Sequence, residues 1–308
     1  MNHILRSQQF DRPRLEKLFS ETDKLRSIYE DLDSRRGLMT SLQGKLMFAA
    51  FYEPSSRTRF SFCSAAHYLG MTTIWTEDAG KFSSAMKGET LEDTIHVLCQ
   101  YDPSAIILRH PDIGAAERAA SIVNKFGYRA SIINAGDGAG QHPTQALLDL
   151  YTIERELGRL DDITVTFGGD LANGRTVRSL VYLLSKFDNV RLILLSPAHL
   201  KLGADIIDHL REHNVPFSET ENMLEALEAA DIIYWTRIQT ERGSTSDLNL
   251  RIGKAEMEHI KPNSRLLHPL PRINEISTEI DEYHRSAHFR QTRNGMFVRM
   301  ALLKNTCK

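Results

Sequence analysis

Short apolar runs alternate along this chain with stretches whose apolar residues recur at helical spacing. Residues 45–51 (KLMFAAF) form an almost continuous apolar run that predicts a buried strand, and Pro54 prevents this strand from continuing. Apolar residues then recur at i, i+3, i+4 and i+7 between Phe62 and Leu69, which predicts a helix that ends at Gly70. The chain therefore changes from strand to helix close to residues 54–62.

The same alternation continues through the rest of the sequence. The first half predicts strands at 71–76, 105–109 and 130–134, with helices at 89–101 and 113–126. A long helix is predicted at 144–157, followed by strands at 163–167, 191–195, 232–235 and 266–267 and helices at 176–187 and 200–213. Because strands and helices alternate in this way, we expect parallel sheets with helices on both faces.

The predicted fold class is α/β, with two successive parallel-sheet domains joined by long helices. A C-terminal helix over about 289–308 is expected to return to the first domain. The first domain would then comprise 1–143 plus about 290–308, and the second 144–289. A polar, turn-rich loop at 241–249 (ERGSTSDLN) is the best candidate for a mobile lid.

Composition excludes several classes of protein. The net charge of −2 and the pI near 6.6 give no basic surplus of the kind that nucleic-acid-binding proteins carry. No stretch approaches the roughly 18 apolar residues that a membrane span needs, and the N-terminus has no apolar core of signal-peptide length. Cys63, Cys99 and Cys307 are odd in number and widely spaced, which favours reduced thiols over a disulfide framework or a zinc site. We therefore expect a cytoplasmic protein that binds neither membrane nor nucleic acid.

The segment PSSRTRFSF, residues 54–62, places hydroxyls and guanidiniums where the strand turns into the helix. Four of its residues fall on the first helical turn: Ser55, Ser56, Arg57 and Thr58. The N–H groups of that turn have no intrahelical acceptor and lie at the positive end of the helix dipole. The segment therefore predicts an anion site, although a serine N-cap with two solvated arginines is an alternative.

Polar side chains also follow the other predicted strands. These are Arg109 and His110, His142 and Gln145, Arg175, Arg237 and Gln239, and the segment HPLPR from His268 to Arg272. In open α/β sheets, ligands bind beyond the carboxyl ends of the strands. Each residue alone could be a surface ion pair or a rigid loop, but arginines gathered at one sheet edge repel one another unless an anion lies between them. We therefore expect two anion sites: Arg57, Arg109 and His142 in the first domain, and Arg175 and Arg237 in the second.

Motifs for other ligands are absent from the sequence. The turns GGDLANG and GDGAG lack the G-x-G-x-x-G spacing of dinucleotide sites, and no GxxxxGK[ST] phosphate loop occurs. The histidines lack metal-ligand spacing, so His110, His142 and His268 are better explained as hydrogen-bonding groups. No cofactor and no metal is expected.

A series of motifs now points to a family. In order they are PSSRTRFSF, MKGET, ILRHP, NAGDG, QHPTQALLDL, GDLANGRTVRSL, TRIQTER, HPLPR and NGMFVRMALL, between about Phe51 and Leu303. This series closely resembles the catalytic chain of the aspartate carbamoyltransferase family. The resemblance implies transfer of a carbamoyl group from carbamoyl phosphate to the α-amino group of L-aspartate, in de novo pyrimidine biosynthesis.

The resemblance also implies a role for each matching residue. Ser55, Ser56, Arg57 and Thr58 would bind the phosphate of carbamoyl phosphate. Arg109, His142 and Thr58 would polarise its carbonyl, and Gln145 would bind its amide. Arg175, Arg237 and Gln239 would bind the carboxylates of aspartate, and the backbone around Leu270 would contact both substrates. Glu53 and Arg242 would pair when the lid closes.

The resemblance further implies a homotrimer with shared active sites. Ser83 and Lys87 would reach into the site of a neighbouring subunit, where Lys87 contacts both substrates. The resemblance leaves open whether regulatory chains bind. Ser56 stands where relatives often have threonine, which keeps the hydroxyl. The alternatives are an ornithine carbamoyltransferase, which would carry HCLP where this chain has Pro269, and a noncatalytic homologue.

Overall fold

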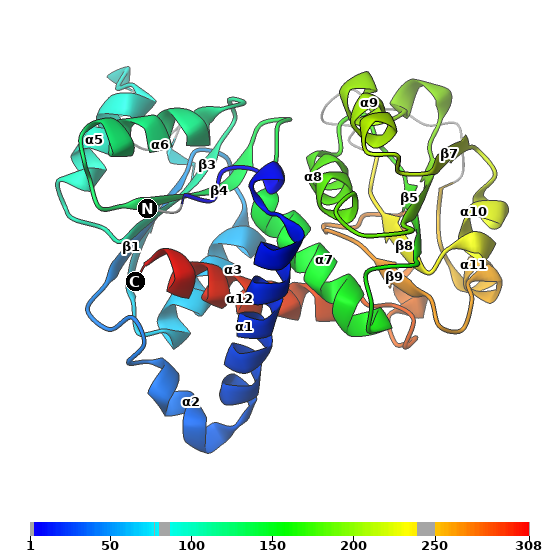
Figure 1. Ribbon diagram of the computed structural model, residues 1–308, viewed down its shortest axis with the longest axis horizontal. Helices are drawn as coiled ribbons and strands as arrows, with labels where there is room; N and C mark the ends of the chain where they lie inside the picture. The colour runs from blue at the N-terminus through cyan, green and yellow to red at the C-terminus, as the bar shows by residue number, and fades with distance from the viewer. Residues whose placement is uncertain (1–2, 77, 80–86, 239–249, 308) are drawn as a thin grey trace. The chain divides into compact units, whose positions relative to one another are not determined.

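The computed structural model describes residues 3–76, 78–79, 87–238 and 250–307. It divides into two compact units, Met1–Thr144 with Gly295–Lys308, and Gln145–Asn294. Each unit is built on its own parallel sheet (Figure 1). The predicted α/β class, with two successive parallel sheets and a C-terminal helix that returns to the first, is confirmed.

The first unit contains a sheet with the strand order β2-β1-β3-β4. Its strands are β1 (Leu46–Phe51), β2 (Thr72–Thr76), β3 (Ala105–His110) and β4 (Ser131–Asp137). Its helices are α1 (Arg12–Glu30), α2 (Leu32–Leu38), α3 (Ser56–Tyr68), α5 (Leu91–Cys99) and α6 (Ala115–Lys125), with a short 3-10 turn at Ser7–Gln9. Figure 1 shows α5 and α6 over one face of this sheet and α3 over the other. The helices thus cover both faces, as the apolar runs of the strands require.

One core cluster of the first unit lies between the sheet and the α5–α6 layer. Phe48 and Ile106 from the strands pack there with Ile95 of α5 and Val123 of α6, and all four are buried. The C-terminal helix α12 (His288–Thr306) is tied to the same unit over its last turns, because Ser131 Oγ donates to the Thr306 carbonyl at 3.1 Å.

The second unit contains a sheet with the strand order β7-β6-β5-β8-β9. Its strands are β5 (Thr164–Gly168), β6 (Arg191–Leu195), β7 (Phe217–Thr220), β8 (Ile232–Trp235) and β9 (Arg265–Leu267). Its helices are α8 (Arg175–Leu184), α9 (Ala204–Glu212), α10 (Met223–Ala229) and α11 (Lys254–His259), with 3-10 turns at Ala198–Leu200 and Thr278–Ile280. Figure 1 shows α8 and α9 on one side of this sheet and α10 and α11 on the other. The helix α7 (Pro143–Leu157) begins just before this unit and runs into it.

Several elements differ from the sequence prediction. The pattern did not predict α1, α2, β7, α10 or α11. The single helix predicted at 200–213 is two elements, a 3-10 turn and then α9, because the chain passes through extended backbone at Gly203 before α9 begins. Among the described residues, no helix combines the length and the apolar character needed to cross a membrane. All three cysteines are free thiols, as predicted.

Candidate active site

The first turn of α3 is formed as the sequence predicts. Ser55 is the N-cap, and the first intrahelical bond runs from the Arg59 N–H to the Ser55 carbonyl at 3.1 Å. The N–H groups that precede Arg59 therefore lie at the open end of the helix, where an anion is favoured. Arg57 is exposed, whereas the Thr58 side chain is buried. The turn thus offers an exposed cation beside a buried hydroxyl.

Arg109 lies at the carboxyl end of β3, between β1 and β4. Its backbone pairs with Phe51 of β1, so the register places it directly beside the end of that strand. Its guanidinium donates to the Ala135 carbonyl at 3.0 Å, and another nitrogen lies 3.4 Å from the Glu53 carboxylate. The side chain is only 12% exposed, so the guanidinium has little freedom to move. A cation is therefore held at the point where β1, β3 and β4 end.

The loop between β4 and α7 is organised by Asp137. Its two carboxylate oxygens accept from the Gly114 N–H at 3.0 Å and the Gln141 N–H at 2.6 Å. At Gly138 the backbone has φ +53°, and a side chain there would meet the Pro111 carbonyl oxygen at 2.1 Å, so only glycine fits. This loop sets His142, which is buried, immediately before the first residue of α7.

His110 has a local structural role. Its Nδ1 accepts from the Asp112 N–H at 3.0 Å, and its ring lies 4.7 Å from the ring of Tyr52. Burial lowers the pKa of His110 below its usual value, although the nearby Asp112 carboxylate opposes this shift. The neutral imidazole therefore accepts a hydrogen bond that shapes the turn after β3.

In the second unit, the ends of β5 and β8 are held in close contact. The Thr236 N–H donates to the Gly168 carbonyl at 2.8 Å. A side chain at Gly169, which has φ +113°, would approach the Thr236 carbonyl oxygen to 2.1 Å. Because these strands are neighbours, the segments that follow them begin side by side. Those segments carry Arg175, the first residue of α8, and Arg237, and both are partly buried.

The HPLPR segment is held by a series of hydrogen bonds. The Leu270 N–H donates to His268 Nδ1 at 2.8 Å, and His268 Nε2 lies 2.9 Å from the Glu275 carboxylate. Burial raises the pKa of Glu275, but the hydrogen bond and charge of His268 together with backbone hydrogen bonds outweigh it, and the net shift is downward. Arg272 forms an ion pair with Asp281. The backbone at Leu270, with φ +58°, is thus held by the buried His268 side chain, which Glu275 contacts in turn.

Gln145 projects from the first turn of α7, three residues after His142. Its Nε2 donates to Asp149 Oδ1 at 2.8 Å. The contact with Asp149 is a feature that the sequence prediction did not include.

Some predicted site residues lie outside the part of the chain that the structure describes. These are Ser83, Gln239 and Arg242, together with the lid segment 241–249. Lys87 is described and is exposed. Across the described residues, no group of three or more His, Cys, Asp or Glu side chains is arranged to hold a metal ion.

Comparison with known proteins identifies the family. The carbamoyl-phosphate-binding domain model of aspartate/ornithine carbamoyltransferases matches residues 2–155, and the aspartate/ornithine-binding domain model matches residues 161–306. This chain belongs to the aspartate/ornithine carbamoyltransferase family. A chloroplastic aspartate carbamoyltransferase of Oryza sativa subsp. japonica is 45% identical over 312 residues, which cover 99% of this chain and 84% of that protein.

Solved structures of aspartate transcarbamoylases agree with this family assignment. The catalytic subunit of the M. jannaschii enzyme superposes with a TM-score of 0.89 at 40% identity, covering 99% of this chain and 98% of that chain. The Trypanosoma cruzi enzyme, crystallised in complex with carbamoyl phosphate and aspartate, also gives a TM-score of 0.89, at 36% identity over 98% of this chain and 96% of its own. Both similarities extend over the two units of the carbamoyltransferase fold.

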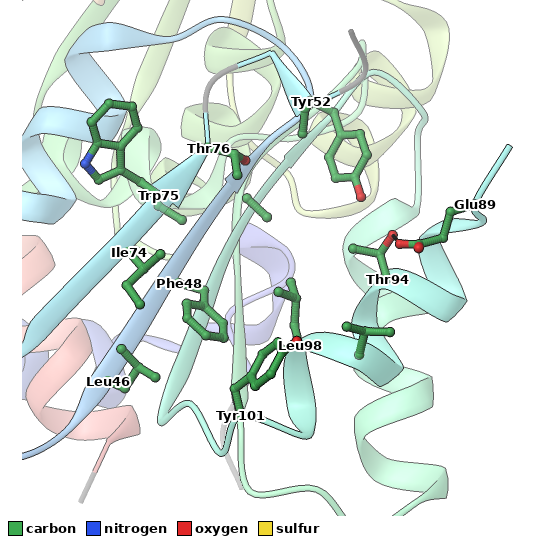
Figure 2. A pocket seen from close by; sticks show the side chains of 14 residues that line it. Leu46, Phe48, Tyr52, Ile74, Trp75, Thr76, Glu89, Thr94, Leu98 and Tyr101 are labelled. Atoms are coloured by element: carbon green, nitrogen blue, oxygen red, sulfur yellow. Dashed lines mark hydrogen bonds between the residues drawn. The ribbon is translucent and has the colours of Figure 1, made fainter. Parts of the chain in front are cut away.

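One feature of this carbamoyltransferase-family chain was not predicted from its sequence. An apolar groove of about 530 Å³ is lined by side chains of β1, β2 and α5 (Figure 2). Its apolar lining includes Leu46, Phe48, Ala50, Ile74, Trp75, Val97, Leu98 and Tyr101. Ile74 is 54% exposed and Tyr101 is 62% exposed, which is unusual for large apolar side chains that lie together. Most residues of β2 are exposed, so the part of the chain that the structure describes leaves this surface uncovered.

Proposed function

We propose that this chain transfers the carbamoyl group of carbamoyl phosphate to the α-amino group of L-aspartate. The products are N-carbamoyl-L-aspartate and phosphate, and the reaction belongs to de novo pyrimidine biosynthesis. The observation that carries the proposal is the placement of cationic side chains at the strand ends of both sheets, one set in each unit. Each of the two anionic substrates thus has a set of its own.

The first unit would bind carbamoyl phosphate. Its phosphate would lie on the first turn of α3, held by Ser55, Ser56, Arg57 and Thr58 and by the backbone N–H groups of that turn. Arg109, His142 and Thr58 would surround the carbonyl oxygen, and Gln145 would accept from the amino group. The fixed guanidinium of Arg109 supports this role, because a cation that is already in place does not reorganise as charge develops.

The second unit would bind aspartate. Arg175 and Arg237, with Gln239, would hold its two carboxylates, and the backbone at Leu270 would contact both substrates. The close pairing of Gly168 and Thr236 supports this arrangement, because it starts the two arginine-bearing segments side by side. This unit would therefore select the amino acid, and the first unit the carbamoyl donor.

The reaction would need no protein nucleophile. The amino nitrogen of aspartate attacks the carbamoyl carbon directly, the C–O bond to phosphate breaks, and the departing phosphate accepts the proton that the amine loses. Negative charge on the carbonyl oxygen would be stabilised by Arg109, His142 and Thr58. The remaining acceleration would come from holding the two substrates in contact.

We also propose a homotrimer in which Ser83 and Lys87 complete the site of a neighbouring subunit. The exposed groove of β1, β2 and α5 supports an interface with another copy, since it lies in the unit that carries Lys87 and presents Trp75 and Tyr101 to solvent. Glu53, which lies beside Arg109, would pair with Arg242 on closure. The cytoplasmic location stays a prediction of the sequence.

The test is an assay with carbamoyl phosphate and either L-aspartate or L-ornithine. We expect a ureido product from aspartate and none from ornithine, because Pro269 and the arginines of the second unit suit an acidic partner. Product from ornithine alone would make the chain an ornithine carbamoyltransferase. No product from either amino acid would favour a noncatalytic homologue.

A further inference from the structure

A buried carboxylate, Asp149, lies one helical turn beyond Gln145 on α7. It has no solvent exposure. Its Oδ1 accepts from Gln145 Nε2 at 2.8 Å and from Gln291 Nε2 at 2.6 Å, and its Oδ2 accepts from the Tyr234 hydroxyl at 2.7 Å. All three of these donors are neutral. A charged acceptor in such a place makes strong hydrogen bonds and orients the groups that donate to it.

The carboxylate determines which end of the Gln145 carboxamide faces it. A carboxamide has a donating nitrogen and an accepting oxygen of nearly equal size, and a half turn exchanges them. An ionised carboxylate only accepts, so the nitrogen of Gln145 must face Asp149. The flipped orientation would set the oxygen against a buried negative charge, which is costly. The oxygen of Gln145 is therefore directed away from Asp149.

The same carboxylate is connected to the HPLPR segment. Gln291, whose nitrogen donates to Asp149, accepts from the His268 N–H through its Oε1 at 2.9 Å. His268 in turn accepts from the Leu270 N–H at 2.8 Å. The hydrogen bonds therefore run in one direction from the backbone around Leu270 to Asp149. Asp149 joins α7, α12 and the loop after β9.

We propose that Asp149 is a positioning residue that makes the site select a carbamoyl group over an acyl group of the same shape. The inference rests on the proposed function, in which Gln145 accepts from the carbamoyl amino group. Acetyl phosphate has a methyl group in place of that amino group and cannot donate. With Asp149 present, Gln145 offers the carbamoyl amino group an oxygen, and this hydrogen bond is lost with acetyl phosphate.

The test is Asp149→Asn, which keeps the size of the side chain and replaces one acceptor with a donor. The inhibition constant of acetyl phosphate is compared with the KM for carbamoyl phosphate during carbamoyl transfer to aspartate. In the variant we expect the preference for carbamoyl phosphate to fall about tenfold, because Gln145 can now turn its oxygen toward residue 149. An unchanged preference in a variant that keeps its circular dichroism spectrum would overturn the inference.

Tyr234→Phe is the matched control. It removes one donor from Asp149 Oδ2 and leaves the bond from Gln145 to Oδ1 in place. A merely structural role for the cluster predicts that both variants lose stability and keep the preference. The positioning role predicts that the preference falls only in Asp149→Asn. An equal fall in both variants would also contradict the inference.

A second measurement does not depend on the fold of the variant. A neutron crystal structure of the unmodified chain would show the deuterons of Gln145. We expect a deuteron on Nε2 directed at Asp149 Oδ1, and a carboxamide oxygen in that place would overturn the inference. Absence of carbamoyl transfer by the unmodified chain would instead contradict the proposed function, and the orientation of Gln145 would still be tested.

Discussion

The two sets of proposed anion-binding residues are built from different parts of the fold. In the first unit, Arg109 belongs to β3 itself, and its guanidinium contacts the Ala135 carbonyl and Glu53. In the second unit, Arg175 follows a loop and Arg237 follows the end of β8. A residue within a strand is oriented by the backbone ladder, whereas residues after strands depend on the loops that carry them. The first unit therefore offers a rigid site for carbamoyl phosphate, and the second unit a more variable site for the amino acid that accepts the carbamoyl group.

The largest effect is expected from Arg109→Ala. We predict that kcat falls roughly a hundredfold or more, because a fixed donor to the developing oxyanion is lost. Arg118→Ala is a matched control, since Arg118 lies on α6 and forms exposed ion pairs with Glu92 and Asp112. Its rate should stay within about twofold of the unmodified chain. Steady-state kinetics at saturating substrates would check both, and a rate for Arg109→Ala within a few-fold would contradict the role.

A smaller and more selective effect is expected from Arg237→Ala. The KM for aspartate should rise roughly 10- to 150-fold, the effect of losing a hydrogen bond to a charged group, and carbamoyl phosphate binding should change little. Arg178→Ala is the control, because Arg178 lies on α8 and pairs with Asp205. Equal weakening of both substrates by Arg237→Ala, measured by kinetics and by equilibrium binding, would show that the two units do not divide the substrates.

The proposed shared site makes a prediction about mixed oligomers. Lys87→Ala and Arg57→Ala subunits should each be inactive alone, and mixing them should restore part of the activity. In a mixed trimer, a subunit with an intact Arg57 can lie beside a neighbour with an intact Lys87, which recreates a native site. The activity is measured after the subunits have been dissociated and reassembled together. Absence of recovery in verified hybrids would contradict a site that draws on two subunits.

The smallest effect on rate is expected from Glu156→Gln, which tests the scaffold of the second unit. Glu156 lies 2.9 Å from Arg265 and 2.7 Å from Arg290. Burial raises the pKa of Glu156, but the hydrogen bonds and charges of Arg290 and Arg265 outweigh it, and the net shift is below the ordinary 4.5. The free energy of unfolding should fall by about 3 kcal/mol at neutral pH, with kcat unchanged.

The free energy of unfolding that Glu156→Gln removes depends on pH, and the direction of this dependence follows from the pKa shift of Glu156. Because the pKa of Glu156 is lower in the folded chain than in the unfolded chain, its charge stabilises the fold above pH 4.5, and this contribution is lost as the pH falls through the lowered pKa. The difference between the unmodified chain and Glu156→Gln should therefore shrink in acid. Denaturant unfolding at neutral and acidic pH measures it, and a constant difference would contradict the ion pairs.

The sequence predicted the regular parts of the fold well. The strands at 191–195 and 232–235 were predicted to the residue, because each contains an apolar run that polar residues bound, Arg191 and Ser196 in the first and Asp231 and Thr236 in the second. The helices α1 and α2 were missed because their apolar residues are scattered among many charges. The Asp11 N-cap with Pro13 in the first turn was an available signal for α1.

The sequence predicted the candidate site only where the site residues lie within a single segment of the chain. The first turn of α3 and the strand-end position of Arg109 follow from the local sequence. The role of Asp149 does not, because its partners Tyr234 and Gln291 lie 85 and 142 residues away. The groove beside β2 was missed for a similar reason, since it combines side chains from three elements that are separate in the sequence.

The proposed division of the two substrates between the two units can be tested by a crystal structure with a bisubstrate compound that joins a phosphonate to L-aspartate. We predict the phosphonate at the first turn of α3 with Arg109 beside it, and the two carboxylates on Arg175 and Arg237. A compound bound elsewhere, with these guanidiniums directed away from it, would contradict the central claim that each unit holds one anionic substrate.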